Sequence, residues 1–483
     1  MTTLGQKRML IGGELVESES GRWDDSINPA SEIVIGQSPA GTAGDVERAV
    51  AAAQVAWPVW AAAGPGARAG VLRALAAKLA ERADDLIKAE VMDSGNTVTS
   101  TRGDIRLSID ALHYFAGAAF ELKGQTLPDA AGMLHYTLRE PYGIVARIVA
   151  FNHPLMFSIA RTAGALAAGN AVIVKPPETC PLSVLLLGEI IREVVPAGVF
   201  NIVTGTGAEV GDALVRHPSI KRIAFIGSVA TGRRIQMSAA QSGVKHVTLE
   251  LGGKNPMIVF PDCDVAKAAV AAVRGASFHW QGQSCGSTSR VMVHDSIYDE
   301  MVERMLEDVS RIRLGDPLDP KTVMGPINSL SHLAKLNDYV EAAQREGAEL
   351  LAGGYRPRGA AFERGFWLEP TVFGGVTQDM RLAREETFGP IVSLMRWRDA
   401  EEAVRIANDS QYGLAASIWT SDLNAALRMS QRVEAGYVWV NTVSGHYQGV
   451  PFGGQKASGV GREEGLEEVF SYTEEKSINI ALG

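Results

Sequence analysis

An alternation of short apolar strands with helices between residues 144 and 250 is the feature that most constrains the fold. Hydrophobic periodicity predicts brief strands separated by amphipathic helices. The expected strands are 144–151, 171–175, 200–203, 222–226 and 246–250. One expected helix follows the first strand and ends near residue 168, and the others cover 181–195, 208–216 and 229–240. Strands joined in this way form parallel sheets with right-handed crossovers. The segment therefore predicts a doubly wound domain of the nucleotide-binding type.

A second alternation begins after Gly253. Its expected elements are strand 256–260, helix 264–277, strand 290–293 and helix 296–311, then strand 391–396, helix 399–409, strand 415–419 and helix 423–433. Upstream of both, short strands and turns fill the first 45 or so residues, and helical patterns cover 44–60, 66–93 and 103–122. We expect an α/β protein with two doubly wound-type domains, one binding a dinucleotide and one catalytic.

The expected domain boundaries follow these changes of pattern. Residues 1–120 and 143–252 are assigned to the dinucleotide-binding domain, and 253–457 to the catalytic domain. Segments 121–142 and 458–483 contain the alternating runs 135–139 and 476–480, which predict a small extra β-sheet. Because exposed strand edges commonly pair with another chain, we interpret both segments as oligomerisation elements.

Composition excludes several classes of protein. The 483 residues suit two or three domains, and 46 basic against 55 acidic residues give a net charge of −9. No Lys/Arg cluster interleaves with aromatic residues, so nucleic acid is not expected as a partner. No apolar run approaches roughly 18 residues, so no membrane span is expected, and the polar start Met1–Arg8 has no signal-peptide core.

The cysteines indicate a reducing compartment. Cys180, Cys263 and Cys285 are odd in number and lack CxxC spacing. They predict neither a disulfide framework nor a zinc site, so we expect a cytoplasmic protein without a metal.

One thiol and one carboxylate form a candidate catalytic pair. Cys285 lies among small residues, and Glu250 ends an apolar strand before a Gly-Gly turn. A single cysteine is more often a small buried hydrophobic residue, so the pair alone leaves its role open. Asn152 follows another strand, where its side-chain amide could donate to an oxyanion, although an ordinary turn Asn is the simpler interpretation.

Two strand ends suggest phosphate and ribose binding. In Phe225–Gly232 a strand enters a glycine turn and a helix, whose first N–H groups and positive dipole suit a pyrophosphate. Gly205–Gly211 has one residue too many for the usual dinucleotide fingerprint and is interpreted as a glycine-rich turn lining the site. Lys175 and Glu178 follow strand 171–175, where ligands of parallel sheets bind. A carboxylate there accepts bonds from ribose hydroxyls and repels a 2′-phosphate, but a solvated charged pair remains an alternative.

Taken together, these segments resemble the aldehyde dehydrogenase superfamily of the hydrolytic, NAD(P)-dependent type. The likeness covers nearly the whole chain, in the same order. The matching segments are Phe151-Asn152-His153-Pro154, Lys175-Pro176-Pro177-Glu178, Phe225-Ile226-Gly227-Ser228, Glu250-Leu251-Gly252-Gly253-Lys254, Gly282-Gln283-Ser284-Cys285, Glu386-Thr387-Phe388-Gly389-Pro390, and Asn441 with Pro451-Phe452-Gly453-Gly454.

The resemblance implies oxidation of a small aldehyde to a carboxylic acid. Cys285 would add to the carbonyl, while the Asn152 side chain and the Cys285 backbone N–H hold the oxyanion. Loss of a hydride from the thiohemiacetal would leave a thioester, and Glu250 would activate the water that releases the acid. Phe151 stands where relatives often carry Trp, which retains an aromatic ring beside Asn152.

The resemblance also implies cofactor contacts. Lys175 and Glu178 would hold the adenosine ribose, Glu386 the nicotinamide ribose, and Phe388 would pack beside the nicotinamide. The remaining expected cofactor positions are Phe151, Gly207, Gly211, Phe225, Gly227, Ser228, Gly232 and Leu251. Glu178 favours NAD, with NADP as an alternative.

The implied substrate pocket is largely aromatic, with room at Ala160. Its other expected positions are Phe157, His279, Trp280, Ser284, His446 and Phe452. This set predicts a medium-sized or aromatic aldehyde. It contains no Arg, which disfavours a short ω-carboxylated semialdehyde because its carboxylate would have no partner.

Several alternatives stay open. The chain could be a semialdehyde dehydrogenase or a betaine-type aldehyde dehydrogenase. It could also be a CoA-acylating relative, although Glu250 disfavours that alternative. The remaining alternatives are a thiol hydrolase without a cofactor and a non-catalytic structural relative. By the same likeness, we expect a homodimer or homotetramer.

Overall fold

Five parallel strands form the centre of the first sheet, as the alternation predicted. The computed structural model describes residues 3–128 and 132–482. The sheet has the order β22-β12-β11-β8-β9-β10-β2-β3. Its central strands are β8 (Ile144–Ile148), β9 (Ala171–Lys175), β10 (Phe200–Ile202), β11 (Ile220–Ile226) and β12 (His246–Glu250). Strand order reverses between β8 and β11, and ligands of such sheets bind beyond the carboxyl ends at this switch point.

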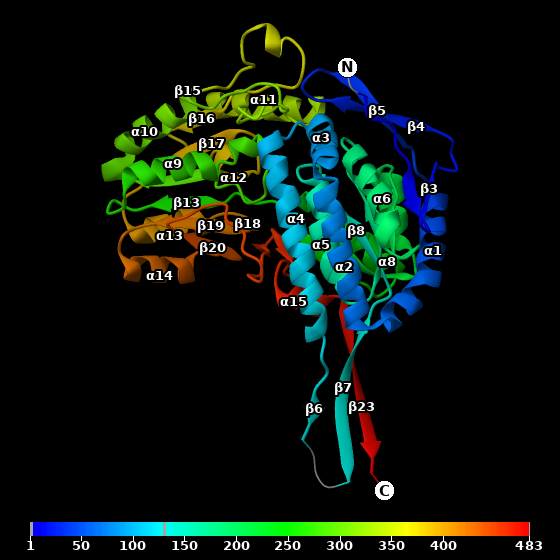
Figure 1. The fold of residues 1–483 in the computed structure, drawn as a ribbon. Helices are drawn as coiled ribbons and strands as arrows, with labels where there is room; N and C mark the ends of the chain where they lie inside the picture. The colour runs from blue at the N-terminus through cyan, green and yellow to red at the C-terminus, as the bar shows by residue number, and fades with distance from the viewer. Residues whose placement is uncertain (1–2, 129–131, 483) are drawn as a thin grey trace.

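Helices pack on both faces of this sheet, and short strands close its edges (Figure 1). The helices that connect the central strands are α5 (Pro154–Ala167), α6 (Leu182–Val194), α7 (Asp212–Arg216) and α8 (Val229–Ser242). The antiparallel edge strands are β2 (Met9–Ile11), β3 (Glu14–Val16) and β22 (Gly459–Val460). Two predicted bounds were wrong. β8 ends at Ile148 rather than at 151, and the expected helix 208–216 begins as a π-helical turn, η2 (Gly207–Gly211).

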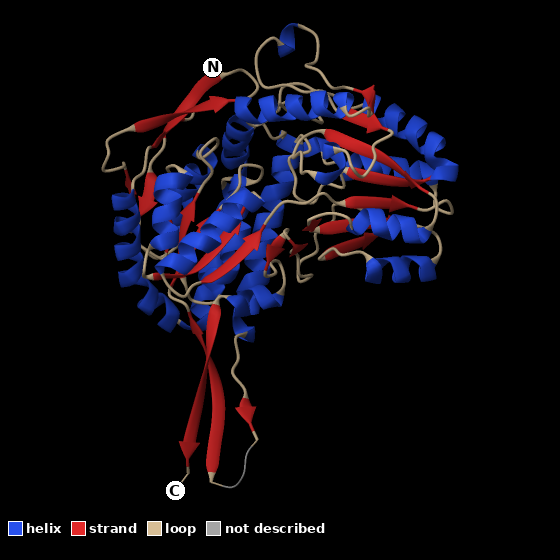
Figure 2. Ribbon diagram, turned by 180° about the vertical axis from the view of Figure 1, so that it is seen from behind, coloured by secondary structure: helices blue, strands red, loops and turns tan. Residues whose placement is uncertain are grey.

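The N-terminal part adds a three-stranded sheet and four long helices. The strands are β1 (Gly5–Gln6), β4 (Trp23–Asn28) and β5 (Ile33–Pro39), and the helices are α1 (Ala43–Ala62), α2 (Gly64–Glu81), α3 (Ala83–Ser94) and α4 (Val98–Ala118), with the 3₁₀ turn η1 (Ala119–Glu121). The predicted continuous helix 66–93 is wrong, because Arg82 leaves the helical conformation with φ −104° and ψ 16°. Figure 2 shows the molecule from behind, with helices and strands in different colours.

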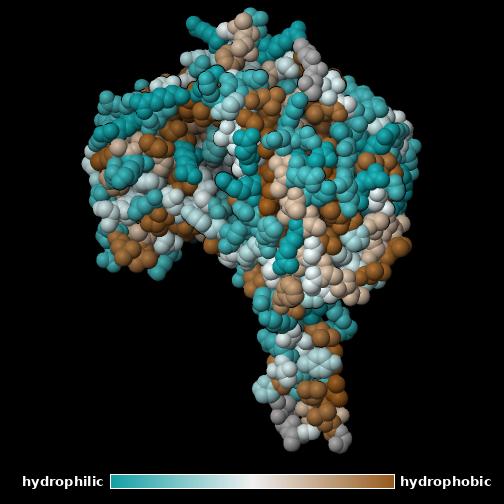
Figure 3. Space-filling view, viewed as in Figure 1, coloured by the Kyte–Doolittle hydropathy of each residue, from teal (hydrophilic) through white to brown (hydrophobic). Residues whose placement is uncertain are grey.

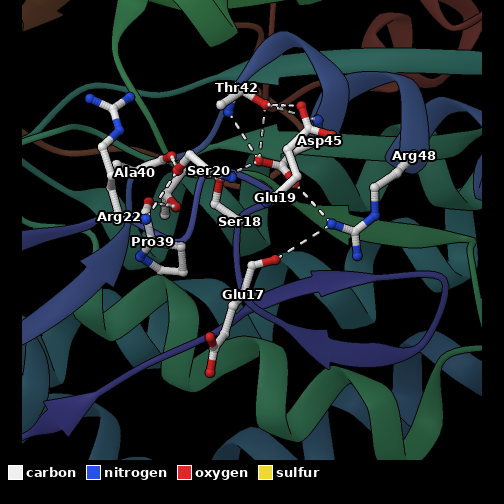
Figure 4. A network of polar contacts seen from close by, with 11 residues as sticks. Glu17, Ser18, Glu19, Ser20, Arg22, Pro39, Ala40, Thr42, Asp45 and Arg48 are labelled. Atoms are coloured by element: carbon white, nitrogen blue, oxygen red, sulfur yellow. Dashed lines mark hydrogen bonds and ion pairs between the residues drawn. The ribbon is translucent and has the colours of Figure 1, made fainter.

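Buried Asp45 holds the start of α1 (Figure 4). Its carboxylate accepts from the Thr42 backbone N–H at 3.0 Å and the Ser18 hydroxyl at 2.6 Å, and pairs with Arg48 at 2.9 Å. The Thr42 hydroxyl in turn accepts from the Asp45 N–H, which completes a capping box. These bonds satisfy the buried charge and tie the N-terminal strands to α1.

The second body is built on a seven-stranded sheet of order β15-β16-β17-β14-β13-β19-β20. Its strands are β13 (Pro256–Val259), β14 (Arg290–His294), β15 (Glu349–Ala352), β16 (Thr371–Gly374), β17 (Ile391–Trp397), β19 (Ala415–Trp419) and β20 (Tyr437–Val440). Its helices are α9 (Val265–Gly275), α10 (Tyr298–Ser310), α11 (Leu330–Arg345), α12 (Arg381–Arg384), α13 (Ala400–Asn408) and α14 (Leu423–Arg432), with the 3₁₀ turns η3 (Phe278–Trp280), η4 (Asp295–Ile297) and η5 (Ala360–Phe362). Strand β15 is antiparallel and the other pairings are parallel. The predicted α/β class is confirmed for both bodies.

A narrow β arm projects from the first body (Figure 1). Strand β7 (Met133–Pro141) pairs with β23 (Thr473–Ala481) along its whole length, and β6 (Thr126–Leu127) lies on its other side. Apolar side chains on the arm are exposed (Figure 3), namely Leu127, Met133, Leu134, Leu138, Ile480 and Leu482. The predicted extra sheet is therefore present, and its role in oligomerisation stays a prediction.

Part of the C-terminal segment packs on the first body instead of joining the arm. After the two-stranded ribbon of β18 (Tyr412–Gly413) and β21 (Gln455–Lys456), β22 pairs with β12, and α15 (Leu466–Ser471) follows. Val469 and Tyr472 are buried in the first core. The predicted domain boundaries stay predictions, and positions 1–2, 129–131 and 483 of the predicted segments lie outside the described residues.

Among the helices described here, none combines the length and the apolar character needed to cross a bilayer.

Candidate active site

The carboxyl ends of β8 and β12 and a loop of the second body converge on one cavity. Glu250 is the last residue of β12, Asn152 lies between β8 and α5, and Cys285 lies between η3 and β14. Cys285 and Glu250 line a cavity of about 470 Å³. Asn152 itself is buried beside it, and its neighbour His153 lines the wall.

The Cys285 thiol and the Glu250 carboxyl line the same cavity, and each shifts the pKa of the other. Burial, reinforced by the nearby charge of Glu463, raises the pKa of Glu250 to about 8, and its Oε1 has no hydrogen-bond partner among the described residues. Burial, and then the adjacent Glu250, raises the pKa of the Cys285 thiol well above its usual value. Both groups are therefore mainly protonated near neutral pH, and Glu250 titrates where a proton acceptor is most useful.

Neighbouring amides fix the backbone on either side of this pair. The Asn255 side chain donates to the carbonyl oxygens of Cys285 at 2.7 Å and Ser287 at 3.0 Å. Gly282 has φ 65°, and a Cβ there would meet the Gly389 carbonyl oxygen at 2.0 Å. On the other side, the Asn96 amide donates to the Asn152 carbonyl at 2.9 Å, while Asn152 Oδ1 is buried without a partner among the described residues. Sequence reasoning missed Asn96 and Asn255, because no motif assigns either residue to the site.

The residues expected at the adenosine end lie together beyond β9. Lys175 is buried, and its ammonium donates to the Pro176 carbonyl at 3.1 Å and lies 3.8 Å from Glu178 Oε1. Desolvation lowers the pKa of Lys175. Glu178 is exposed and accepts from the Gly207 N–H, and Gly211 lies against the Lys175 side chain. A second cavity, of about 230 Å³, is lined by Glu178, Gly205 and Thr206.

The glycine turn before α8 is fitted closely to the end of β12. Gly227 donates to the Glu250 carbonyl at 3.1 Å, and the Phe225 ring lies against Gly227. A Cβ at Gly232 would meet Leu251 Cδ2 at 2.8 Å, so glycine permits the close approach of helix and strand. Ser228 caps the helix by accepting from the Thr231 N–H at 3.3 Å. The other N–H groups of this exposed first turn suit a phosphate.

Glu386 and Phe388 reach the same region from the second body. Glu386 Oε1 accepts from the Gly253 N–H at 2.9 Å, and burial raises the pKa of Glu386. Phe388 has φ 57°, and its ring makes an edge-to-face contact with Phe151 at 5.5 Å between centroids. An exposed carboxylate, an open helix N-terminus and this aromatic pair fit the ribose, pyrophosphate and nicotinamide parts of a dinucleotide.

All seven residues expected in the substrate pocket line the 470 Å³ cavity. They are Phe157, Ala160, His279, Trp280, Ser284, His446 and Phe452. Burial, together with His153 and Arg274, lowers the pKa of His279 to about 4, so this ring is neutral. His153 shares a hydrogen bond with Asp104 at 2.8 Å and also lines the cavity.

The expectation of a pocket without arginine was wrong, because Arg106, Arg161 and Arg274 also line the cavity. Arg106 comes from α4 and Arg274 from the last turn of α9, and neither lies in a motif that marks the site. Arg161 is paired with Glu463 at 3.2 Å and with Glu464, which also bonds His446 at 2.9 Å.

The part of the chain that the structure describes holds no group of three or more His, Cys, Asp or Glu side chains suited to a metal ion.

These features define an α/β oxidoreductase of the dinucleotide-dependent class. They are two largely parallel sheets, a glycine turn and helix start at a strand switch point, and a thiol and a carboxyl group in the adjoining cavity. The chain belongs to the aldehyde dehydrogenase family, whose family model matches residues 15–478.

The comparisons with known proteins agree over nearly the full length. Aldehyde dehydrogenase tropH of Talaromyces stipitatus is 46% identical over 466 residues, which cover 95% of this chain and 90% of the relative. The crystal structure of an NAD-dependent aldehyde dehydrogenase from Sinorhizobium meliloti has a TM-score of 0.96 and 38% identity, covering 100% of this chain and 96% of that one. A structure of 3,6-anhydro-L-galactose dehydrogenase in complex with NAP has a TM-score of 0.96 and 36% identity, covering 98% and 100%.

Proposed function

We propose that the protein oxidises a medium-sized or aromatic aldehyde to its carboxylic acid through a covalent bond to Cys285. NAD-dependent aldehyde oxidation is general for the family to which the chain belongs. The observation that carries the mechanism is the placement of Cys285 and Glu250 together in one cavity beside the switch point.

The first step is addition of sulfur to the aldehyde carbon. As the C–S bond forms, the carbonyl π electrons move to oxygen and the thiol proton passes to the Glu250 carboxylate. The thiol is protonated at rest, so the ionised fraction of Glu250 controls this transfer. The product of this step is a thiohemiacetal anion.

Asn152 and the Cys285 backbone N–H are the proposed donors to that oxyanion. Asn96 holds the Asn152 backbone, and Asn255 holds the Cys285 carbonyl, so both donors are positioned before the substrate arrives. Preorganised donors of this kind stabilise developing charge without reorganisation.

NAD, or NADP as an alternative, supplies a hydride acceptor when bound. Lys175 and Glu178 would hold its adenosine ribose, the α8 start its pyrophosphate, and Glu386 and Phe388 its nicotinamide riboside. Glu178 is the residue that favours NAD, because its carboxylate repels a 2′-phosphate. Relatives of this chain include an NAD-dependent enzyme and a complex with NAP, so both cofactors are to be tested.

The last step is hydrolysis of the thioester on Cys285. Once Glu250 has released the thiol proton to solvent, its carboxylate takes a proton from water while the water oxygen bonds to the acyl carbon. The C–S bond then breaks, and the proton on Glu250 passes to the leaving sulfur to return the thiol. A CoA-acylating reaction would not need this base, so Glu250 favours hydrolysis. The aromatic wall and the cavity volume of about 470 Å³ favour a medium-sized or aromatic substrate over acetaldehyde.

The test is a panel of aromatic, aliphatic and semialdehyde substrates, assayed by NADH or NADPH formation with wild type and Cys285→Ala. We expect activity in the wild type and none above background in the variant. An undiminished rate in Cys285→Ala would refute covalent catalysis, and a requirement for coenzyme A would favour the acylating alternative.

The β arm supports a homodimer or homotetramer, because β6 and β23 carry its exposed edges and its apolar side chains face solvent. The described cysteines are all free thiols, which suits the cytoplasm. Light scattering of the intact protein and of a chain ending before Thr473 tests the assembly.

A further inference from the structure

Two arginines of the cavity wall carry charges that the protein leaves uncompensated. Arg106 and Arg274 are exposed at the cavity, and neither forms an ion pair with any described residue. The guanidinium group is always charged and offers a planar pair of donors that matches a carboxylate. These two charges therefore influence which aldehydes the substrate cavity binds.

The other ionisable groups around the cavity are already balanced. Arg161 is paired with Glu463 and Glu464, and Glu464 also holds His446. Asp104 is bonded to His153. Glu250, with its pKa of about 8, is mainly protonated at neutral pH, and His279, with its pKa of about 4, is neutral. Among the described acids of the wall, none forms an ion pair with Arg106 or Arg274.

The two arginines reach the cavity from two different helices, α4 and the end of α9. The Ser100 hydroxyl of α4 donates to the His279 carbonyl of η3 at 3.0 Å, and both Ser100 and Arg106 line the cavity. A Cβ at Gly275 would lie 3.3 Å from Val443 Cγ1, so the end of α9 packs against Val443.

An unused polar atom lies on the α9 side. The Ser444 hydroxyl oxygen is buried, has no hydrogen-bond partner among the described residues, and belongs to a residue of the cavity wall. Ser444 has φ 57°, a conformation that few non-glycine residues adopt. The Arg274 guanidinium and the Ser444 hydroxyl line the same cavity, and both are groups that can donate to an anionic oxygen.

We propose that Arg106 and Arg274 bind a carboxylate of the substrate remote from its formyl group, so the enzyme acts on aldehydes that carry a second, anionic end. The inference rests on the proposed aldehyde oxidation and specifies its substrate class. A rigid ring between the two ends would also use the aromatic wall formed by residues such as Trp280 and Phe452. The same charges repel a cationic substrate, which disfavours the betaine-type alternative.

The test compares three aldehydes of one size class: 4-carboxybenzaldehyde, its methyl ester and benzaldehyde. We expect the wild type to prefer the carboxylate over the ester by about tenfold or more in kcat/KM, mainly through KM, and added salt to weaken this preference. Arg274→Gln and Arg106→Gln should each reduce the carboxylate-to-ester ratio severalfold. Because the measure is a ratio, a general loss of activity in either variant cancels.

Arg102→Gln is the matched control. Arg102 lies on α4 like Arg106, is exposed, does not line the cavity, and forms only a long ion pair of 3.9 Å with Asp84. The control should keep the wild-type ratio. An equal loss in Arg102→Gln, or a wild type that treats acid and ester alike while oxidising both, would overturn carboxylate binding and leave aldehyde oxidation standing. Absence of oxidation of every aldehyde would instead overturn the proposed function.

Discussion

Replacing Glu250 with Gln separates the two chemical steps at Cys285. The amide keeps the volume of the side chain but cannot accept a proton. Hydrolysis of the thioester should then slow by about 10²–10⁴, the usual contribution of a positioned general base. Stopped-flow assays should show a burst of NADH, close to one per site but slower than in the wild type because Glu250 also accepts the thiol proton, followed by little turnover.

The magnitude of the pH effect follows from the buried position of Glu250. With a pKa of about 8, the carboxyl group is about one tenth ionised at pH 7 and about nine tenths ionised at pH 9. The steady-state rate limited by hydrolysis should therefore rise about tenfold across this interval in the wild type and level off above it. The direction follows from desolvation, which holds the proton on the folded enzyme at pH values where an exposed Glu has lost it.

The pH profile of Glu250→Gln is the decisive control. Cys285 is unchanged in this variant, so a slope that depends on the thiol would survive the substitution, while a slope that depends on Glu250 would vanish. Multiple-turnover and burst rates measured between pH 6 and 9 supply the comparison. A wild-type hydrolysis rate that is flat over this range, or near-normal turnover in the variant, would refute the reasoning.

Three further results are expected. Asn152→Ala should lower kcat/KM by about 10²–10³ in steady-state assays with little change in Tm, because its side-chain oxygen has no partner among the described residues; unchanged kinetics would exclude the oxyanion role. Glu178→Ser should raise the NADP-to-NAD ratio of kcat/KM by about tenfold or more, since the repelling carboxylate is gone, and a constant ratio would contradict this role. Glu90→Gln should raise Tm relative to wild type more at pH 8 than at pH 5. Burial raises the pKa of Glu90 to about 8, so the wild type loses stability as pH rises from about 4.5 to 8. Melting temperatures of the two proteins that change in parallel with pH would contradict this.

The central strands were the most predictable part of the fold. Strand β9 (Ala171–Lys175) follows directly from four apolar residues before a lysine, because a strand covered on both faces must be apolar throughout. The break at Arg82 was not predictable, since the periodicity continues through it. The sequence pattern does not predict the elements of segment 312–390, which contains α11, β15 and β16. Long loops separate these elements, so strands and helices do not alternate regularly there.

The candidate site was predictable where a motif marks it and unpredictable where tertiary packing creates it. Cys285, Glu250 and the glycine turn before α8 lie in recognisable segments. Arg106 and Arg274 look like ordinary solvated residues of amphipathic helices, and only the folded chain places both at one cavity. The partners of Arg161 are some 300 residues away, at Glu463 and Glu464, and no local pattern links positions so distant.

The segment in which the chain returns from the second body to the first holds the residues next to Glu250 in place. Leu251 N–H donates to the Ser458 carbonyl at 2.9 Å, and the Ser458 hydroxyl donates to the Gly252 carbonyl at 2.7 Å, so a two-residue strand pins the residues that follow Glu250. The arm strand β23 begins only a few positions beyond α15. A protease nick between Lys456 and Ser458 would thus free one end of this segment and loosen its hold on the residues that follow Glu250, so we expect catalysis to fall without any change at Cys285.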